Sequence, residues 1–396
     1  MMKRSFALLV TLLFAAPPLV AQQEEGPANA TGAAVNTTGK GYSAAIVIEP
    51  TTKQILFQEN AHVALPTASM AKMMTMLITM QQIQEGQLKL DTPITISARA
   101  SKMGGSQIYA REGQIFPLQT LIAATMVQSA NDAAEAIAEK IAGSAEAFVD
   151  MMNDKARQMG LKESTFYDPH GLPNSQDPKR VDTMSAYDLA MLAIEVMKYP
   201  LLREYAKTPT LPFANGTFTA GLTNPNHLIN PHKRDYFADA TGIKTGFSAP
   251  AGYCVTAAAT RGNMNLICVV MGAKAPNGSG SSFDIATRLM NDAFSHHRVL
   301  TAVKKGAVVG QVGVAEGQSK TVPAAAGADV NALVKRGDEG TIRVSLAPSP
   351  VAAPVRAGQQ VGWVVVSESG HQINRVPAVA ATNVEKQPLW KKFWPF

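Results

Sequence analysis

The chain has only two cysteines among its 396 residues, and charged residues make up just 17% of it. Two cysteines cannot form the disulfide framework of a small secreted domain. The sequence contains no dense basic block, RNA-binding signature or zinc-finger spacing, which argues against a nucleic-acid partner. It also contains neither a G-x-S-x-G elbow nor an H-E-x-x-H zinc motif. What is present is a 46% hydrophobic composition, which indicates a folded protein with room for a large domain and a smaller one.

The two cysteines, Cys254 and Cys268, fall in a predicted β-hairpin whose loop is Gly262-Asn263. This register places Cys268 opposite Ala257 and Cys254 opposite Met271. Because side chains alternate between the faces of a sheet, the two sulfurs are expected on opposite faces. We therefore predict two buried free thiols, although an exported compartment would permit a bridge.

The N-terminus has the layout of a secretory signal peptide. Lys3 and Arg4 precede an apolar run over residues 6–16, which two prolines end before a small-residue cleavage point. The run is too short for a membrane-spanning helix, which needs roughly 20 apolar residues. The sequence predicts a signal peptide over residues 1–21 and a flexible lead-in over residues 22–40.

Hydrophobic patterns place several helices between an opening β-hairpin and a closing set of strands. The predicted strands are 44–49, 54–57, 253–259 and 265–272, and the predicted helices are 69–85, 118–127, 133–141, 186–197 and 283–294. This order predicts an α+β domain over residues 41–298 with one antiparallel sheet. Short β-type runs at 308–314, 341–346 and 361–366 predict a small all-β domain over residues 300–380.

Ser69-Met70-Ala71-Lys72 is the only S-x-x-K pattern in the chain. Residues three apart share a helix face, so the Ser69 hydroxyl and the Lys72 amine can touch. A serine nucleophile needs a neighbouring base, and lysine can be that base when burial or a nearby cation lowers its pKa. Taken alone, the pair also fits a surface serine and lysine on an amphipathic helix.

Two further motifs occur once each and follow in order. In Ser129-Ala130-Asn131, between two predicted helices, the serine can relay a proton and the asparagine can bond a substrate amide. Alone, this motif would suit a helix N-cap. Lys244-Thr245-Gly246 is predicted to begin a strand, where the lysine can hold Ser129 and a carboxylate while the glycine admits a substrate backbone. The ordered trio is typical of class A β-lactamases and penicillin-binding proteins.

Around these motifs the sequence resembles the low-molecular-weight penicillin-binding proteins, the serine-type D-alanyl-D-alanine carboxypeptidases of the peptidase S11 family. Residues 66–75, 168–172, 242–246 and 251–254 carry the resemblance, which covers residues 41–294 and is weaker beyond them. It implies a β-lactamase/transpeptidase-like α+β domain followed by a small all-β domain.

The resemblance also implies a reaction on the D-Ala-D-Ala ends of peptidoglycan pentapeptides. Ser69 attacks the carbonyl of the penultimate D-Ala, and Lys72 takes its proton. Ser129 and Lys244 then pass a proton to the leaving D-Ala amine, and water hydrolyses the acyl-enzyme. β-Lactams are expected to acylate Ser69 as covalent inhibitors, and the scheme uses no cofactor or metal.

The substrate-binding residues implied by the resemblance are Asn131, Thr245, Gly246 and Phe247. Asn131 orients the peptide, and the oxyanion lies between the backbone N–H groups of Ser69 and Phe247. The sequence departs from the family where an arginine often helps to bind the terminal carboxylate, because Ser282 stands at that place. Thr245, Lys244 or Lys274 would then bind the carboxylate without it.

Two alternatives share these motifs. A class A β-lactamase would add a glutamate that activates the deacylating water, followed by a Leu-Asn pair, but the corresponding window at 163–167 has Glu163 without that pair. A non-catalytic peptidoglycan-binding protein would be expected to lose at least one motif residue, and none is missing.

The C-terminal residues 384–396 end in an aromatic and basic stretch, 389–396, that holds two of the three tryptophans. On a helix its aromatic and lysine side chains separate to opposite sides, a pattern that suits a membrane interface with anionic headgroups. An unstructured end or a short strand is the alternative, because Pro388 and Pro395 limit any helix. We predict an exported enzyme held peripherally on the periplasmic face of the inner membrane.

Overall fold

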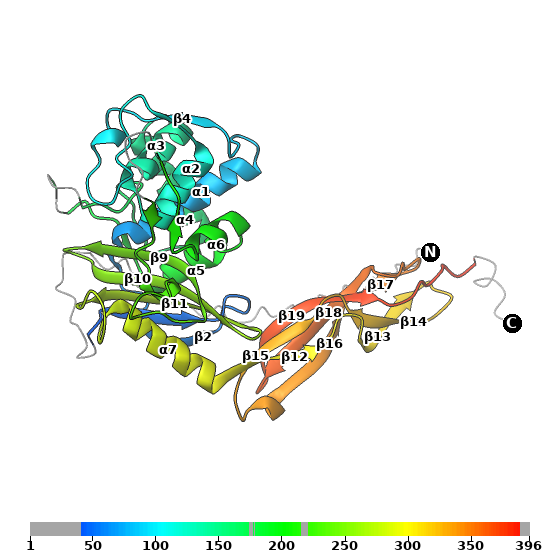
Figure 1. The fold of residues 1–396 in the computed structure, drawn as a ribbon. Helices are drawn as coiled ribbons and strands as arrows, with labels where there is room; N and C mark the ends of the chain where they lie inside the picture. The colour runs from blue at the N-terminus through cyan, green and yellow to red at the C-terminus, as the bar shows by residue number, and fades with distance from the viewer. Residues whose placement is uncertain (1–40, 174–176, 178, 215–220, 389–396) are drawn as a thin grey trace, which may run out of the picture. The chain divides into compact units, whose positions relative to one another are not determined.

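The structure is a computed structural model that describes residues 41–173, 177, 179–214 and 221–388 (Figure 1). The predicted signal peptide over 1–21, the lead-in over 22–40 and the aromatic stretch 389–396 lie outside the described residues. None of the helices within the described ranges combines the length and apolarity needed to traverse a bilayer.

A five-stranded antiparallel sheet forms the centre of the α+β part, in the order β2-β1-β11-β10-β9. Its strands are β1 (Ala44–Ile48), β2 (Ile55–Glu59), β9 (Ala240–Ser248), β10 (Gly252–Arg261) and β11 (Met264–Ala273). The inner strands β1 and β11 are buried on both faces, which explains their continuous apolar sequences. The prediction of one antiparallel sheet is therefore confirmed.

The K-T-G motif lies inside the edge strand β9, so the prediction that Lys244 begins a strand is wrong. β9 starts at Ala240, which pairs with Ala259 of β10. Pairing with the long neighbouring strand β10 extends β9 backwards through Ala240 and Gly242, whose own β-propensity is low.

The two cysteines are free and buried, as predicted. Cys268 lies opposite Ala257, whereas a register shift displaces Cys254 from a regular pair with Met271. Cys254 belongs to the apolar cluster on one face of the sheet and Cys268 to the cluster on the other. The predicted opposite orientation is confirmed.

Helices cover both faces of this sheet (Figure 1). The helices are α1 (Lys72–Gln84), α2 (Leu118–Ala123), α3 (Asn131–Ala142), α4 (Ala145–Met159), α5 (Ala186–Val196), α6 (Pro200–Ala206) and α7 (Ser282–His296). α7 packs against β10 and β11 on one face, and α5 packs against β1 and β11 on the other. Short pairs β3–β6 (Leu65–Pro66, Thr183–Met184), β4–β5 (Pro93–Thr95, Ile115–Pro117) and β7–β8 (Thr210–Leu211, Leu222–Thr223) complete this part.

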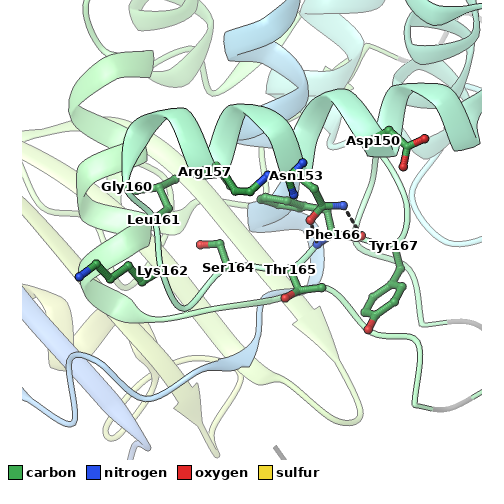
Figure 2. A pocket seen from close by; sticks show the side chains of 11 residues that line it. Asp150, Asn153, Arg157, Gly160, Leu161, Lys162, Ser164, Thr165, Phe166 and Tyr167 are labelled. Carbon is green, nitrogen blue, oxygen red and sulfur yellow. Dashed lines mark hydrogen bonds between the residues drawn. The ribbon is translucent and has the colours of Figure 1, made fainter. Parts of the chain in front are cut away.

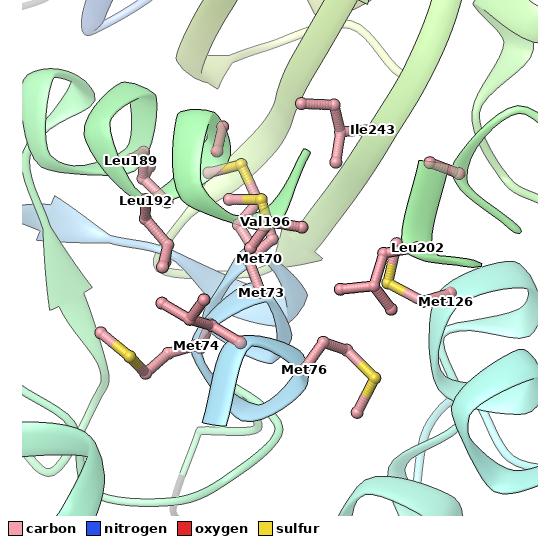
Figure 3. Packing of buried hydrophobic residues seen from close by; sticks show 14 of the residues in the cluster. Met70, Met73, Met74, Met76, Met126, Leu189, Leu192, Val196, Leu202 and Ile243 are labelled. Carbon is pink, nitrogen blue, oxygen red and sulfur yellow. The ribbon is translucent and has the colours of Figure 1, made fainter. Parts of the chain in front are cut away.

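The core beneath α1 is rich in methionine (Figure 3). Met70, Met73 and Met74 are fully buried, and the surrounding cluster includes Leu189 and Leu192 of α5. Unbranched, polarisable methionine side chains fill irregular gaps in a core. This packing fixes α1 between the helical layer and the sheet.

The C-terminal part is all-β. Its strands are β12 (His297–Val303), β13 (Val308–Ala315), β14 (Thr321–Ala326), β15 (Val330–Lys335), β16 (Ile342–Pro348), β17 (Val351–Ala352), β18 (Gln360–Glu368) and β19 (His371–Ala380). A six-stranded sheet has the order β16-β18-β19-β14-β13-β17, and β12 pairs with β15. Small valine and alanine side chains form its separate core.

Candidate active site

The predicted nucleophile, Ser69, lies in a 3-10 turn, Ala68–Ala71, that leads directly into α1. The sequence predicted an α-helix from residue 69, so the tighter turn is a correction at the helix start. Lys72 is the first residue of α1, and its Nζ lies 2.8 Å from Ser69 Oγ. The turn therefore brings the S-x-x-K pair into hydrogen-bond contact.

Lys72 is completely buried, and its Nζ also donates to the backbone carbonyl of His170 at 2.6 Å. Burial, and next the charge of Lys244, hold the pKa of Lys72 well below its usual value. The amine therefore loses its proton more readily than that of an exposed lysine, and the neutral form is the one that can accept a proton.

Ser129 and Lys244 come together from opposite layers of the domain. α2 continues as a π-helical turn, Ala124–Gln128, and Ser129 then takes a left-handed conformation with φ 62°. Such π turns concentrate at functional sites because they redirect a side chain out of the helix line. Lys244 Nζ donates to Ser129 Oγ at 2.7 Å, and burial lowers the pKa of Lys244 to about 7.

Asn131 begins α3 and is held by the segment 104–110. Its backbone N–H donates to Ser106 O and its Nδ2 to Gly104 O, both at 2.7 Å. Its Oδ1 is buried and, among the described residues, has no hydrogen-bond donor. A buried acceptor without a donor is destabilising, so this oxygen is suited to receive an N–H group from a ligand.

The edge strand β9 passes close to the nucleophile turn at Gly246. A Cβ at Gly246 would lie 2.7 Å from Thr67 O, so only glycine fits. Thr245 is half-buried, and Phe247 is 59% exposed and stacks on Tyr253 with ring centroids 4.4 Å apart. β9 thus presents the third motif along the free edge of the sheet.

A pocket of about 440 Å³ at the end of β9 is lined by Phe247, Tyr253 and the exposed Lys274. Ser282, which stands at the place of the family's arginine, is the buried first residue of α7. Two lysines were named as carboxylate-binding groups in place of that arginine. Lys244 is hydrogen-bonded to Ser129, whereas Lys274 lines this pocket.

The loop from Asp168 to Leu172 packs directly against the nucleophile turn. Gly171 has φ +80°, and a Cβ there would lie 1.9 Å from Ala68 O. Asp168 Oδ1 accepts from the backbone N–H groups of His170 and Gly171. The loop is therefore a rigid wall behind Ser69.

Two buried acids that the sequence reasoning missed stabilise this arrangement. Asp132 accepts N–H bonds from Ile108 and Ala110, which fixes the segment that holds Asn131. Asp182 accepts from the backbone of Tyr167 through Oδ1, and its backbone carbonyl accepts from Thr67. Asp132 could have been found from the sequence, because it is a charged residue in an otherwise alanine-rich stretch. Asp182 has polar neighbours in the sequence, so nothing there marks it as buried.

A second hollow, of about 660 Å³, lies between the last turns of α4 and the segment 161–167 (Figure 2). None of the predicted site residues lines it. Asn153 bonds the backbone of Phe166 in both directions, at 2.9 Å each. The side chain of Asn153 is therefore occupied in joining α4 to its neighbouring loop.

Comparison with family models gives two matches. A model described as D-alanyl-D-alanine carboxypeptidase, peptidase S11, matches residues 33–275. A model described as the C-terminal domain of penicillin-binding protein 5 matches residues 299–386.

Curated relatives and solved structures agree with these matches. D-alanyl-D-alanine carboxypeptidase DacF of Bacillus subtilis is 31% identical over 391 residues, 97% of this chain and 95% of the relative. DacC of Escherichia coli is 29% identical over 359 residues, 89% of this chain and 86% of the relative. The crystal structure of PBP3 from Streptococcus pneumoniae is similar with a TM-score of 0.78, 27% identity, and coverage of 87% of this chain and 99% of that one. Penicillin-binding protein 5 from Haemophilus influenzae is similar with a TM-score of 0.72, 26% identity, and coverage of 87% and 98%.

Proposed function

Because the chain belongs to the peptidase S11 family of D-alanyl-D-alanine carboxypeptidases, we propose specific roles for its motif residues in that reaction. The protein is a serine-type D-alanyl-D-alanine carboxypeptidase and a penicillin-binding protein, with an α+β domain followed by an all-β domain. Ser69 Oγ attacks the carbonyl carbon of the penultimate D-Ala while its proton moves to Lys72 Nζ. Ser129 and Lys244 deliver a proton to the leaving D-Ala amine, and water then cleaves the ester at Ser69.

The observation that carries this proposal is the pair of short Ser–Lys contacts. Lys72 lies 2.8 Å from Ser69, and Lys244 lies 2.7 Å from Ser129. Both amines are buried and have lowered pKa values, which suits one as proton acceptor and the other as part of a relay. The Ser69–Lys72 pair provides a path for the proton that leaves the nucleophile. The Ser129–Lys244 pair provides a path for the proton that reaches the leaving amine.

Substrate orientation follows from the second and third motifs. We assign the unpaired Oδ1 of Asn131 to a peptide N–H of the substrate. Gly246, Thr245 and Phe247 line the free edge of β9, where an extended peptide can add as a further strand. The backbone N–H groups of Ser69 and Phe247 are proposed to bind the oxyanion.

β-Lactams are proposed to acylate Ser69, and the resulting acyl-enzyme is proposed to be hydrolysed slowly. Penicillin-binding protein D2 of Listeria monocytogenes has been solved in an ampicillin-bound form; it is 25% identical with a TM-score of 0.56, covering 64% of this chain and 98% of that one. A β-lactamase would need a glutamate aimed at the acyl group. Glu163 is instead engaged at the start of α5, where its Oε2 accepts from Ser185 Oγ at 3.4 Å.

Intact-mass spectrometry with benzylpenicillin tests the proposal. A stable adduct located on Ser69 is expected in the wild type and no adduct in Ser69→Ala. Release of D-Ala from a pentapeptide should disappear in Lys72→Ala and Lys244→Ala. Rapid drug turnover without a lasting adduct would favour the lactamase, and retained D-Ala release in either lysine variant would overturn the assigned roles.

We also propose where the enzyme resides. The predicted signal peptide over 1–21 supports export to the periplasm, and the aromatic and basic stretch 389–396 supports peripheral contact with the inner membrane. We propose domain limits of 41–298 and 300–380, close to the two family matches. The mature chain should sediment together with phosphatidylglycerol vesicles, whereas a version that ends at Pro388 should stay in the supernatant. Equal binding of the two proteins would refute the membrane contact.

A further inference from the structure

The backbone carbonyl of His170 determines where the Lys72 amine points. Lys72 Nζ lies 2.6 Å from His170 O and 2.8 Å from Ser69 Oγ. A neutral amine has two N–H groups and one lone pair. When one N–H is directed at His170 O, the lone pair is left free to face the Ser69 hydroxyl. The direction of this carbonyl therefore decides whether Lys72 can act as a base.

The His170 side chain is clamped between two carboxylates from different elements. Its Nδ1 lies 2.8 Å from Asp168 Oδ1 in its own loop, and its Nε2 lies 3.5 Å from Glu135 Oε2 on α3. The imidazole is 7% exposed and the Glu135 side chain is completely buried. The Nδ1 atom also accepts from the backbone N–H of Leu172 at 3.2 Å, whereas the contact of Nε2 with Glu135 is electrostatic, because the Glu135 oxygens form no hydrogen bond with the described residues. Together these contacts restrict rotation of the ring and of the peptide unit that carries it.

Glu135 has no role in the reaction described above, yet its burial opposes folding. It lies one helical turn after Asn131 and is surrounded by the apolar core of α3. Its partners are His170 and Arg99, whose Nε is 2.6 Å away, and burial raises the pKa of its carboxyl group. A buried carboxylate loses much of its hydration free energy even when it is paired, so the pairing alone is a weak reason for its presence.

Arg99 provides an internal comparison. It also contacts Glu146, a carboxylate that is 71% exposed. The two acids thus share one arginine, but the structure places only Glu135 of the two against the imidazole.

We propose that Glu135 and Asp168 are positioning residues, which clamp the His170 ring and thereby hold its carbonyl on Lys72 Nζ. The inference rests on the proposed function of Ser69 and Lys72. Glu135 joins the helix of the second motif to the loop behind the nucleophile, so the first and second motifs are aligned through one imidazole. Both carboxylates are assigned an effect through the ring rather than a contact with the substrate.

The test measures benzylpenicillin acylation at several drug concentrations, which separates the chemical rate constant from the dissociation constant of the initial complex. In Glu135→Gln we expect the chemical rate constant to fall between about tenfold and a hundredfold, the range for a misplaced catalytic group. The dissociation constant and the titrated fraction of active sites should stay at the wild-type values. Asp168→Asn should lower the chemical rate constant at least as much, because Asp168 also accepts from the backbone N–H groups of His170 and Gly171. The effects of Glu135→Gln and Asp168→Asn should combine to less than their product, because both residues act on one ring.

Glu146→Gln is the matched control, and its chemical rate constant should equal that of the wild type. The inference would be overturned if the chemical rate constant were unchanged in Glu135→Gln or fell equally in Glu146→Gln. It would also be overturned if Glu135→Gln lowered only the titrated fraction of active sites. If Glu135→Gln does not fold, His170→Gln, which keeps the carbonyl and removes the ring, must show the same selective loss. Failure of the wild type to form any adduct would instead refute the proposed function.

Discussion

The amine of Lys244 lies 2.7 Å from the hydroxyl oxygen of Ser129, although the two residues are 115 positions apart in the chain. Lys244 belongs to the edge strand of the sheet and Ser129 to the helical layer. Their contact crosses the site and exists only when both layers are docked. The third motif therefore connects the sheet to the helical layer, in addition to its proposed role in the reaction.

Replacing Lys72 should remove the general base while leaving the nucleophile in place. For Lys72→Gln we expect acylation of Ser69 by benzylpenicillin to slow by roughly 10²–10⁴-fold, the usual contribution of general-base catalysis. Lys72→Arg should be equally slow, because a guanidinium group stays protonated. Stopped-flow or quenched mass measurements give the rate, and a melting curve checks the fold. A rate within roughly threefold of the wild type would show that another group takes the proton.

Lys244 should make the folded protein more stable at moderately alkaline pH than at neutral pH. Burial lowers its pKa from 10.5 to about 7. Between pH 7 and 9 the unfolded chain therefore binds more protons than the folded one, so this group's contribution to the free energy of unfolding rises with pH, by up to about 1.4 kcal/mol per unit. Lys244→Met removes the group and should flatten that rise.

Urea unfolding of the wild type and Lys244→Met at pH 7, 8 and 9 measures the effect. The variant should be inactive and, at pH 7, more stable than the wild type, because it no longer buries an amine that is partly charged there. Parallel pH profiles for the two proteins would contradict the prediction.

Gly171→Ala should disrupt the site itself. A Cβ at Gly171 would lie 1.9 Å from Ala68 O, so the loop or the nucleophile turn has to move. Gly143 is the matched control, because it has nearly the same φ, +83°, and a Cβ at Gly143 would have no atom within 4 Å. Gly143→Ala should cost only the backbone penalty of about 1–2 kcal/mol and keep normal acylation. Gly171→Ala should lose acylation, and equal behaviour of the two variants would refute the close packing.

Asp132→Asn should weaken initial binding of the β-lactam more than the chemical step. Asp132 accepts N–H bonds from Ile108 and Ala110, and an amide at this position turns donors toward some of those N–H groups. The segment that holds Asn131 should loosen, with a loss of about 1–3 kcal/mol in stability. Thermal melts and concentration-dependent acylation measure both effects. The exposed Asp150→Asn serves as the control, and an equal response in both variants would count against the prediction.

The motif residues of the site were predictable from sequence because each motif is contiguous and its order is fixed. Their supports were not, because a buried polar side chain such as Asp182 or Glu135 is defined by a partner far away in the chain. Gly171 is a similar case. Only glycine fits at this position because the carbonyl of Ala68, which lies far earlier in the chain, is in contact with it. The sequence reasoning also overlooked α4, although Ser144 caps its start and Gly160 ends it.

In the all-β part, the predicted runs correspond to β13, β16 and β18, and the other strands, β12, β14, β15, β17 and β19, were missed. β14 has the sequence TVPAAA, which contains too few branched or aromatic residues for a propensity signal. It becomes a strand because β13 and β19 pair with it on either side. Pairing with a strand as distant in the chain as β19 leaves no local trace in the sequence of β14.

The five-stranded sheet also separates the two thiols, with Cys254 on one face and Cys268 on the other. No oxidant can join these sulfurs without taking the sheet apart. The native fold therefore contains no bridge between them, and a disulfide formed in the unfolded chain would have to be reduced before the sheet could close. Folding of this domain thus depends on both thiols staying reduced until the sheet has formed.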